Sequence, residues 1–125
     1  MLEQDDEHTF AVDGRWSENV LKHGFTIVPN ILISGRTHLA LTPTEFYVFV
    51  ALESYRWDNT HSPFPSLTTL AKQTGLHKQT VYRATNALEI KGLLVKHRRF
   101  SKSTVYDLRP ANEELDFIAH INNGD

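Results

Sequence analysis

Apolar residues between positions 66 and 92 recur with the period of two short helices separated by a tight turn. Ser66 is well placed to cap the first helix, and Gly75 supplies the permissive backbone that a sharp corner requires. The inward-facing positions of this first helix are Leu67, Leu70 and Ala71. The pattern therefore predicts two consecutive helices that pack against one core.

The second helix of the pair, predicted from Lys78 to Lys91, has one apolar side and one polar side. Helical periodicity places Val81, Ala84 and Leu88 in one buried stripe. The opposite side carries residues that can reach a DNA groove or a phosphate: Lys78, Gln79, Tyr82, Arg83 and Asn86. Lys91 followed by Gly92 gives a basic last turn and a C-terminal glycine, which end the helix.

After Gly92 the apolar period changes to two, which predicts paired strands at 93–97 and 104–108. Residues 98–103 join them in a turn that carries Arg98, Arg99 and Lys102. A helix with a polar face beside a basic hairpin can contact base edges and phosphates together. For the hairpin alone, a solvated charged turn is the competing interpretation, since charged loops are common.

Two segments before the helix pair complete the predicted core. Residues 25–33 form a β-prone run, interrupted at Pro29, that we expect to be an edge strand. Thr42 and Glu45 have the spacing of a capping box and open a helix over 45–57. This helix is apolar almost all the way round, so several of its sides must be covered.

A last helix is predicted after Pro110, which ends the hairpin. Asn112 is a candidate cap, and the helix extends to Ile121. Its apolar residues cover a broad arc: Leu115, Phe117, Ile118, Ala119 and Ile121. We expect this surface to be covered within the subunit or by a second copy of the chain.

Composition allows one domain and shows where the charge lies. The chain has 125 residues, 40% of them hydrophobic, and no cysteine, which excludes disulfides, cysteine-ligated zinc and cysteine nucleophiles. The formal net charge of -2 conceals a segregation, because residues 77–109 hold eight Lys and Arg against only Glu89 and Asp107. The start lacks a signal-peptide pattern, and no stretch approaches the roughly 18 apolar residues of a membrane span. We expect a cytoplasmic protein without membrane association.

Catalytic and metal-binding patterns are absent from the sequence. It has no Gly-rich phosphate loop and no nucleophile elbow, and none of its seven histidines falls into a metal-binding pair. The acidic run at 5–7 lies in an arm that we expect to be too mobile to hold a catalytic geometry. We therefore expect no enzyme activity, no metal or cofactor, and no small-molecule ligand.

The segment PSLTTLAKQTGLHKQTVYRATNALEIKGLL, residues 65–94, resembles the helix-turn-helix of small bacterial, plasmid and phage winged-helix proteins. These proteins include replication-initiation factors and transcriptional regulators, and the resemblance covers residues 25–108. It implies that the recognition helix touches DNA through Lys78, Gln79, Thr80 and Arg83, and that the wing tip carries Arg98, Arg99 and Lys102. His77 stands where the family has a Ser or Thr cap, which predicts a weaker cap.

The predicted fold is α+β and mainly helical: a winged helix-turn-helix with a β-hairpin wing and a C-terminal helix. We divide the chain into an acidic flexible arm at 1–22, a winged helix-turn-helix domain at 23–110, and a C-terminal helix and tail at 111–125. The predicted DNA-binding residues are Ser66, Thr68, Lys78, Gln79, Thr80, Tyr82, Arg83, Asn86, Arg98, Arg99 and Lys102.

Two functions are compatible with this prediction. The first is sequence-specific binding of double-stranded DNA by a transcriptional regulator or replication initiator of bacterial, plasmid or phage origin. The alternative is a winged-helix protein-interaction module in a replication or partition complex. For the first function we expect a two-fold homodimer, because one recognition helix reads few base pairs. Its target would then be an inverted repeat.

Overall fold

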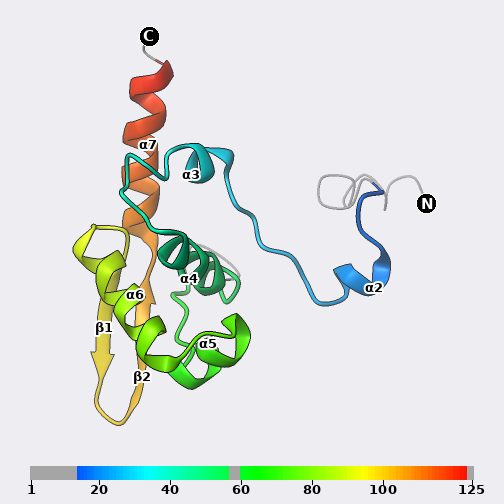
Figure 1. Ribbon diagram of the computed structural model, residues 1–125, viewed down its shortest axis with the longest axis vertical. Helices are drawn as coiled ribbons and strands as arrows, with labels where there is room; N and C mark the ends of the chain where they lie inside the picture. Colours follow the sequence, from blue (N-terminus) through cyan, green and yellow to red (C-terminus); the bar gives the residue numbers. More distant parts are fainter. Residues whose placement is uncertain (1–13, 57–59, 124–125) are drawn as a thin grey trace.

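The computed structural model describes residues 14–56 and 60–123. In chain order its elements are α2 (Glu18–Leu21), α3 (Asn30–Ser34), α4 (Pro43–Glu53), α5 (Leu67–Thr74), α6 (Lys78–Ile90), β1 (Val95–Arg99), β2 (Lys102–Asp107) and α7 (Arg109–Asn123). Helices α4, α5 and α6 form one group, the hairpin projects at one end, and α7 extends at the other (Figure 1). The predicted mainly helical α+β fold, with a hairpin wing and a C-terminal helix, is confirmed. None of the described helices is long and apolar enough to cross a membrane.

Helix α4 begins with the predicted capping box. The Thr42 side chain accepts a hydrogen bond from the Glu45 amide at 3.1 Å, and a Glu45 carboxylate oxygen accepts one from the Thr42 amide at 3.0 Å. The helix ends at Glu53, earlier than predicted, and Trp57 lies outside the described residues. Its inward side packs into the core through Val48, Phe49, Ala51 and Leu52.

The two following helices form the predicted corner. Ser66 caps α5 by accepting a hydrogen bond from the Thr69 amide at 3.0 Å. Gly75 ends α5 in the left-handed region at φ 76°, where a side chain would be strained. The buried residues of α6 are the predicted Val81, Ala84 and Leu88, together with Thr85. Thr85 is tolerated in the core because its hydroxyl donates to the Tyr82 carbonyl at 2.8 Å.

The strands lie nearer the turn than the pattern predicted, since β1 begins at Val95 rather than at 93 and β2 begins at Lys102 rather than at 104. Strand pairing continues to Arg99↔Lys102, so the turn contains only Phe100 and Ser101 rather than residues 98–103. The register shifts by one residue near Arg98, which marks a bulge. On its far side β2 receives support from the loop before α5, because the Tyr106 amide donates to the Pro63 carbonyl at 2.8 Å. The wing is thus anchored to the body along its base.

The predicted edge strand at 25–33 is wrong. Residues 24–29 have no regular structure, and Asn30–Ser34 forms the short helix α3, with Leu32 in the core. An edge strand needs a neighbour, and the sheet of the described residues contains only β1 and β2. Of the predicted arm at 1–22, residues 1–13 lie outside the described part of the chain. The rest includes α2, capped by Ser17, which the pattern did not predict.

Helix α7 begins at Arg109, three residues before the predicted cap Asn112. Pro110 fits in a first turn because that position needs no amide donor. Asp107 provides a hydrogen-bond acceptor for the first backbone amide of the helix. Its carboxylate accepts hydrogen bonds from the Arg109 amide at 3.0 Å and from the Arg109 guanidinium at 2.8 Å. The pKa of Asp107 is lowered to about 2, mainly by the hydrogen bond from the Arg109 side chain.

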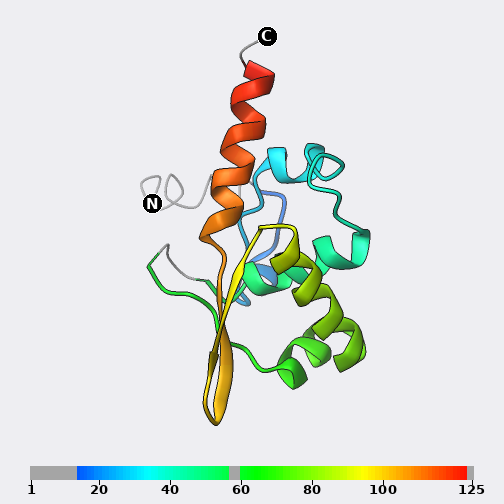
Figure 2. The same ribbon diagram turned by 90° about the vertical axis from the view of Figure 1, so that its left-hand side faces the viewer.

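The apolar arc of α7 is covered only in part. Leu115 and Ile118 are buried, and the helix packs against α3. Phe117 and Ile121 remain 63% and 48% exposed. The distal turns of α7 extend beyond α3 (Figures 1 and 2). Within the described residues, the subunit therefore buries one apolar side of α7 and leaves another apolar side exposed to solvent.

Candidate nucleic-acid interface

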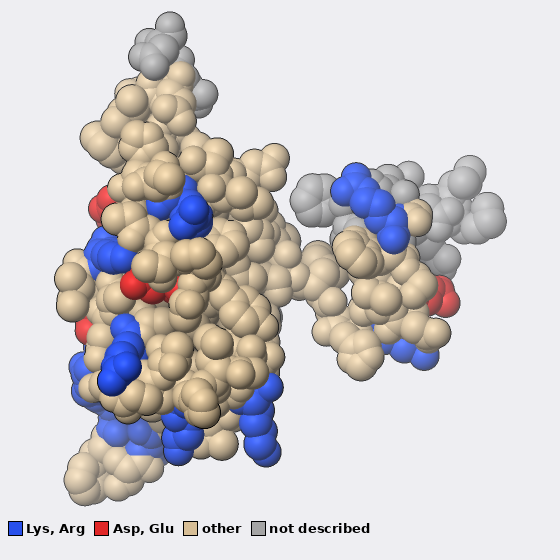
Figure 3. All heavy atoms as spheres, viewed as in Figure 1, with Lys and Arg blue, Asp and Glu red and all other residues tan. Residues whose placement is uncertain are grey.

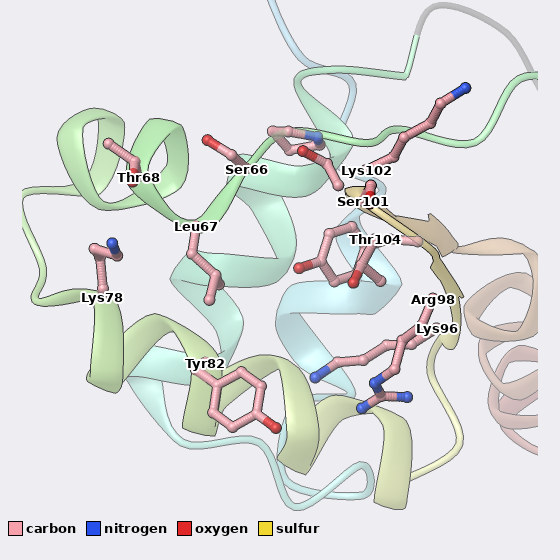
Figure 4. Close-up of a pocket in the computed structure, with 13 residues that line it drawn as sticks. Ser66, Leu67, Thr68, Lys78, Tyr82, Lys96, Arg98, Ser101, Lys102 and Thr104 are labelled. Carbon is pink, nitrogen blue, oxygen red and sulfur yellow. The ribbon is translucent and has the colours of Figure 1, made fainter.

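A hollow of about 490 Å³ lies between the hairpin and the starts of α5 and α6, and we call it the wing groove (Figure 4). Six of the predicted DNA-binding residues line it: Ser66, Thr68, Lys78, Tyr82, Arg98 and Lys102. Its other lining residues are Pro65, Leu67, Lys96, Ser101, Ser103, Thr104 and Tyr106. The fold thus brings side chains of both helices and the wing to one surface.

The remaining predicted residues lie elsewhere on α6 or on the other face of the wing. Gln79 is exposed on α6. Thr80 and Arg83 line a smaller hollow of about 180 Å³ beside the start of α4. Asn86 is half-buried, with its amide oxygen bonded to Lys96. The predicted weak cap of α6 is confirmed, because the His77 side chain makes no capping hydrogen bond.

Lys96 is a prominent member of the wing groove that the sequence prediction missed. Only 8% of it is exposed, and it links β1 to α6. Its backbone amide donates to a Glu89 carboxylate oxygen at 2.9 Å, and its ammonium group donates to Asn86. The ammonium nitrogen also lies 4.7 Å from the centre of the Tyr82 ring. The alternation of β1 could have placed Lys96 on the same strand face as Arg98, but it could not show the partners on α6.

The electrostatics of the wing groove favour an anion. Burial, followed by the positive charge of Arg98, lowers the pKa of Lys96. Hydrogen bonds from Asn86 and Arg98, and then the charge of Lys96, lower the pKa of the Tyr82 phenol. Burial is the larger cause for Lys96 and the Asn86 hydrogen bond for Tyr82, and the closeness of the Lys96 and Arg98 cations adds to both shifts. A phosphate that enters this groove would relieve the crowding.

Arg98 and Arg99 lie on opposite faces of the wing, as their contacts show. Arg98 lines the wing groove. The Arg99 guanidinium lies over the Phe64 ring, 5.3 Å from its centre, and its Nε donates to the Ser103 carbonyl at 2.8 Å. Arg99 is thus held against Phe64 and Ser103, whereas Arg98 contacts Tyr82 within the groove, and a guanidinium on a ring face keeps donors for a phosphate.

Other basic residues differ in their availability. Lys91 is committed to the fold, since its ammonium group lies 2.5 Å from both a Glu45 carboxylate oxygen and the Ala40 carbonyl oxygen. Burial alone would raise the pKa of Glu45, but hydrogen bonds from Lys91 and the Thr42 backbone outweigh it and lower that pKa.

Around the hairpin and the adjacent helices, Lys and Arg side chains gather at the lower end of the surface (Figure 3).

The comparisons with known proteins agree with this geometry. Residues 39–94 match the family model of a helix-turn-helix domain. With the hairpin directly after the matched segment, the fold is that of a winged helix-turn-helix, and the match supports DNA binding. No curated protein matches the chain.

A similar solved structure is the N-terminal domain of the DnaD protein from Geobacillus kaustophilus HTA426. The two chains share 21% sequence identity and superpose with a TM-score of 0.63. The similarity covers 85% of this chain and 92% of the other. At this level of identity the comparison supports the winged-helix fold.

Proposed function

We propose that this chain binds double-stranded DNA, with α6 in the major groove and the wing across the neighbouring phosphates. The observation that carries the proposal is the wing groove, where α5, α6 and the hairpin present polar and cationic side chains to one surface. Lys78, Arg98 and Lys102 would neutralise phosphates there. The Ser66 and Thr68 hydroxyls at the start of α5 would donate to phosphate oxygens.

Base reading is assigned to exposed side chains in the first half of α6. Gln79 suits adenine and Arg83 suits guanine, each through paired hydrogen bonds in the major groove. Thr80, beside them, would contact the same strand. Tyr82 and Asn86 are held by Lys96, so their contribution would be to shape the surface and to donate where they are still accessible. Such a protein acts as a transcriptional regulator or replication initiator and performs no catalysis.

Salt-dependent binding of the full chain to a duplex tests this proposal. We expect fluorescence anisotropy with a labelled duplex to show binding whose log affinity falls linearly with log salt. Three phosphate contacts contribute about -2.7 to the slope for each bound subunit, because each contact contributes about 0.9. A chain that ignores duplex DNA, or binds it without salt dependence, would instead support the protein-interaction module.

A two-fold dimer is part of the proposal, because symmetric pairing would present two recognition helices to an inverted repeat. Its support is the exposed apolar pair Phe117 and Ile121 on the distal turns of α7. Ile118 is buried in the same subunit, so its substitution would damage the fold itself.

We expect Phe117→Glu with Ile121→Glu to convert a dimer into a folded monomer, because two charges would have to enter an apolar interface. Sedimentation at tens of micromolar measures the mass, and circular dichroism checks the helices. Glu113→Lys, an exposed change on the same helix, is the matched control and should leave the mass unchanged. A wild-type chain that sediments as a monomer would rule out the dimer.

A further inference from the structure

The tip of the wing carries the most exposed large apolar side chain of the described residues. Phe100 is 97% exposed and forms the two-residue turn with Ser101. In Figure 3 the uncharged end of the hairpin projects below a group of Lys and Arg side chains. In sequence the flanking cations are Arg98, Arg99 and Lys102. An aromatic ring thus protrudes from the most basic part of the chain.

Turn geometry does not account for a phenylalanine at this position. Ser101 is the turn residue with positive φ, at 60°, and short turns favour Asn, Asp, Gly or Ser. A single exposed apolar residue is common on protein surfaces and by itself indicates nothing. Phe100 differs because its charged neighbours in sequence are all cations and because it lies in the turn of the hairpin, the end of the wing that projects from the body (Figures 1 and 2).

The tip is also held in place. Arg99 Nε donates to the Ser103 carbonyl across the end of the hairpin, and its guanidinium lies on Phe64. Further down, Tyr106 is hydrogen-bonded to Pro63. These contacts hold the strands on both sides of the turn. The ring is therefore presented by a supported hairpin, which reduces the conformational entropy lost when it enters a binding site.

We propose that Phe100 is a wedge that enters the minor groove beside the major groove occupied by α6 and inserts its ring against a base step. The inference rests on the proposed function, which it extends from phosphate contact to distortion of the duplex. Apolar side chains that enter the minor groove partly unstack a base step and bend the helix. Arg98 and Lys102 in the wing groove would hold one of the phosphate strands that border the minor groove, and Arg99 on the opposite face of the wing would reach the other.

The test uses the full chain and a duplex that the wild type selects from a random library, labelled with a donor and an acceptor at its ends. We expect the wild type to shorten the end-to-end distance by bending the duplex, within the range of about 20–90° seen for minor-groove wedges. Phe100→Ser should reduce the affinity about tenfold and remove most of the bend. The salt slope should stay the same because no cation is lost.

Two further variants make the result specific. Phe100→Leu keeps an apolar wedge and should retain most of the bend, whereas Ile33→Ser removes an exposed apolar residue from α3 and should change neither quantity. All three changes are at exposed positions, so folding should be preserved, and thermal melting checks this. If Phe100→Ser binds and bends the duplex like the wild type, the wedge is overturned while DNA binding stands. If the wild type selects no duplex, both proposals fail.

Discussion

Removing three of the four cations of the wing groove together, as Lys78→Ala with Arg98→Ala and Lys102→Ala, should weaken binding to every duplex by about a hundredfold at physiological salt. These residues lie on α6, β1 and β2, so one phosphate strand that passes through the groove could meet all of them. The slope of log affinity against log salt should become shallower by about 2.7 for each bound subunit, which is about 0.9 for each lost contact. Anisotropy titrations at several salt concentrations measure both quantities.

Two controls separate this effect from a general loss of charge. Lys22→Ala removes an exposed cation next to α2, away from the hairpin in Figure 1, and should leave the slope unchanged. Arg99→Ala should have a smaller effect on the slope than Arg98→Ala, because Arg99 faces Phe64 rather than the groove. A triple variant whose slope equals that of the wild type would remove the wing groove from the interface.

Gln79→Ala and Arg83→Ala should each flatten the preference for the selected sequence. A good bidentate contact contributes about 1–3 kcal/mol of discrimination, which corresponds to roughly 5- to 150-fold in relative affinity. Both residues are exposed on α6, and Arg83→Ala should also lower affinity for scrambled DNA because it removes a charge. The measurement compares each variant on the selected duplex and on a scrambled duplex of equal length.

Gln73→Ala is the matched control for Gln79→Ala. Gln73 is exposed on α5, and its side chain donates to the Ser54 hydroxyl at 2.9 Å, so it belongs to the contact between α4 and α5. Its loss should leave sequence preference as it is. Equal losses on selected and scrambled DNA for both α6 variants would reassign Gln79 and Arg83 to phosphate contacts.

Local signals explain why most of the helical fold could be predicted from sequence. The capping box of α4, the Ser66 cap and the left-handed Gly75 all act over a few residues, so their geometry is encoded where they stand. The buried stripe of α6 could be predicted from helical periodicity alone. The hairpin was predicted from its period of two, but the turn was placed too broadly because Arg98 and Ser103 are polar residues that lie within strands.

Features that depend on distant partners could not be predicted in this way. Residues 25–33 have β-forming composition, but the strand that would pair with them does not exist in the described part of the chain. The start of α7 depends on Asp107, which lies at the end of β2. Lys96 was missed for a related reason, since its partners on α6 become visible only when the hairpin is placed against that helix.

The wing is fastened on two sides, to α6 through Lys96 and to the loop before α5 through Tyr106. The distance between the side chains on α6 and those on the hairpin is therefore fixed before any duplex arrives. Under the proposed function the DNA must adapt to this span, since the protein offers little adjustment. Duplexes differ in groove width and in the energy needed to deform them, and these properties depend on sequence. The chain would thus discriminate at base pairs that none of its side chains touches.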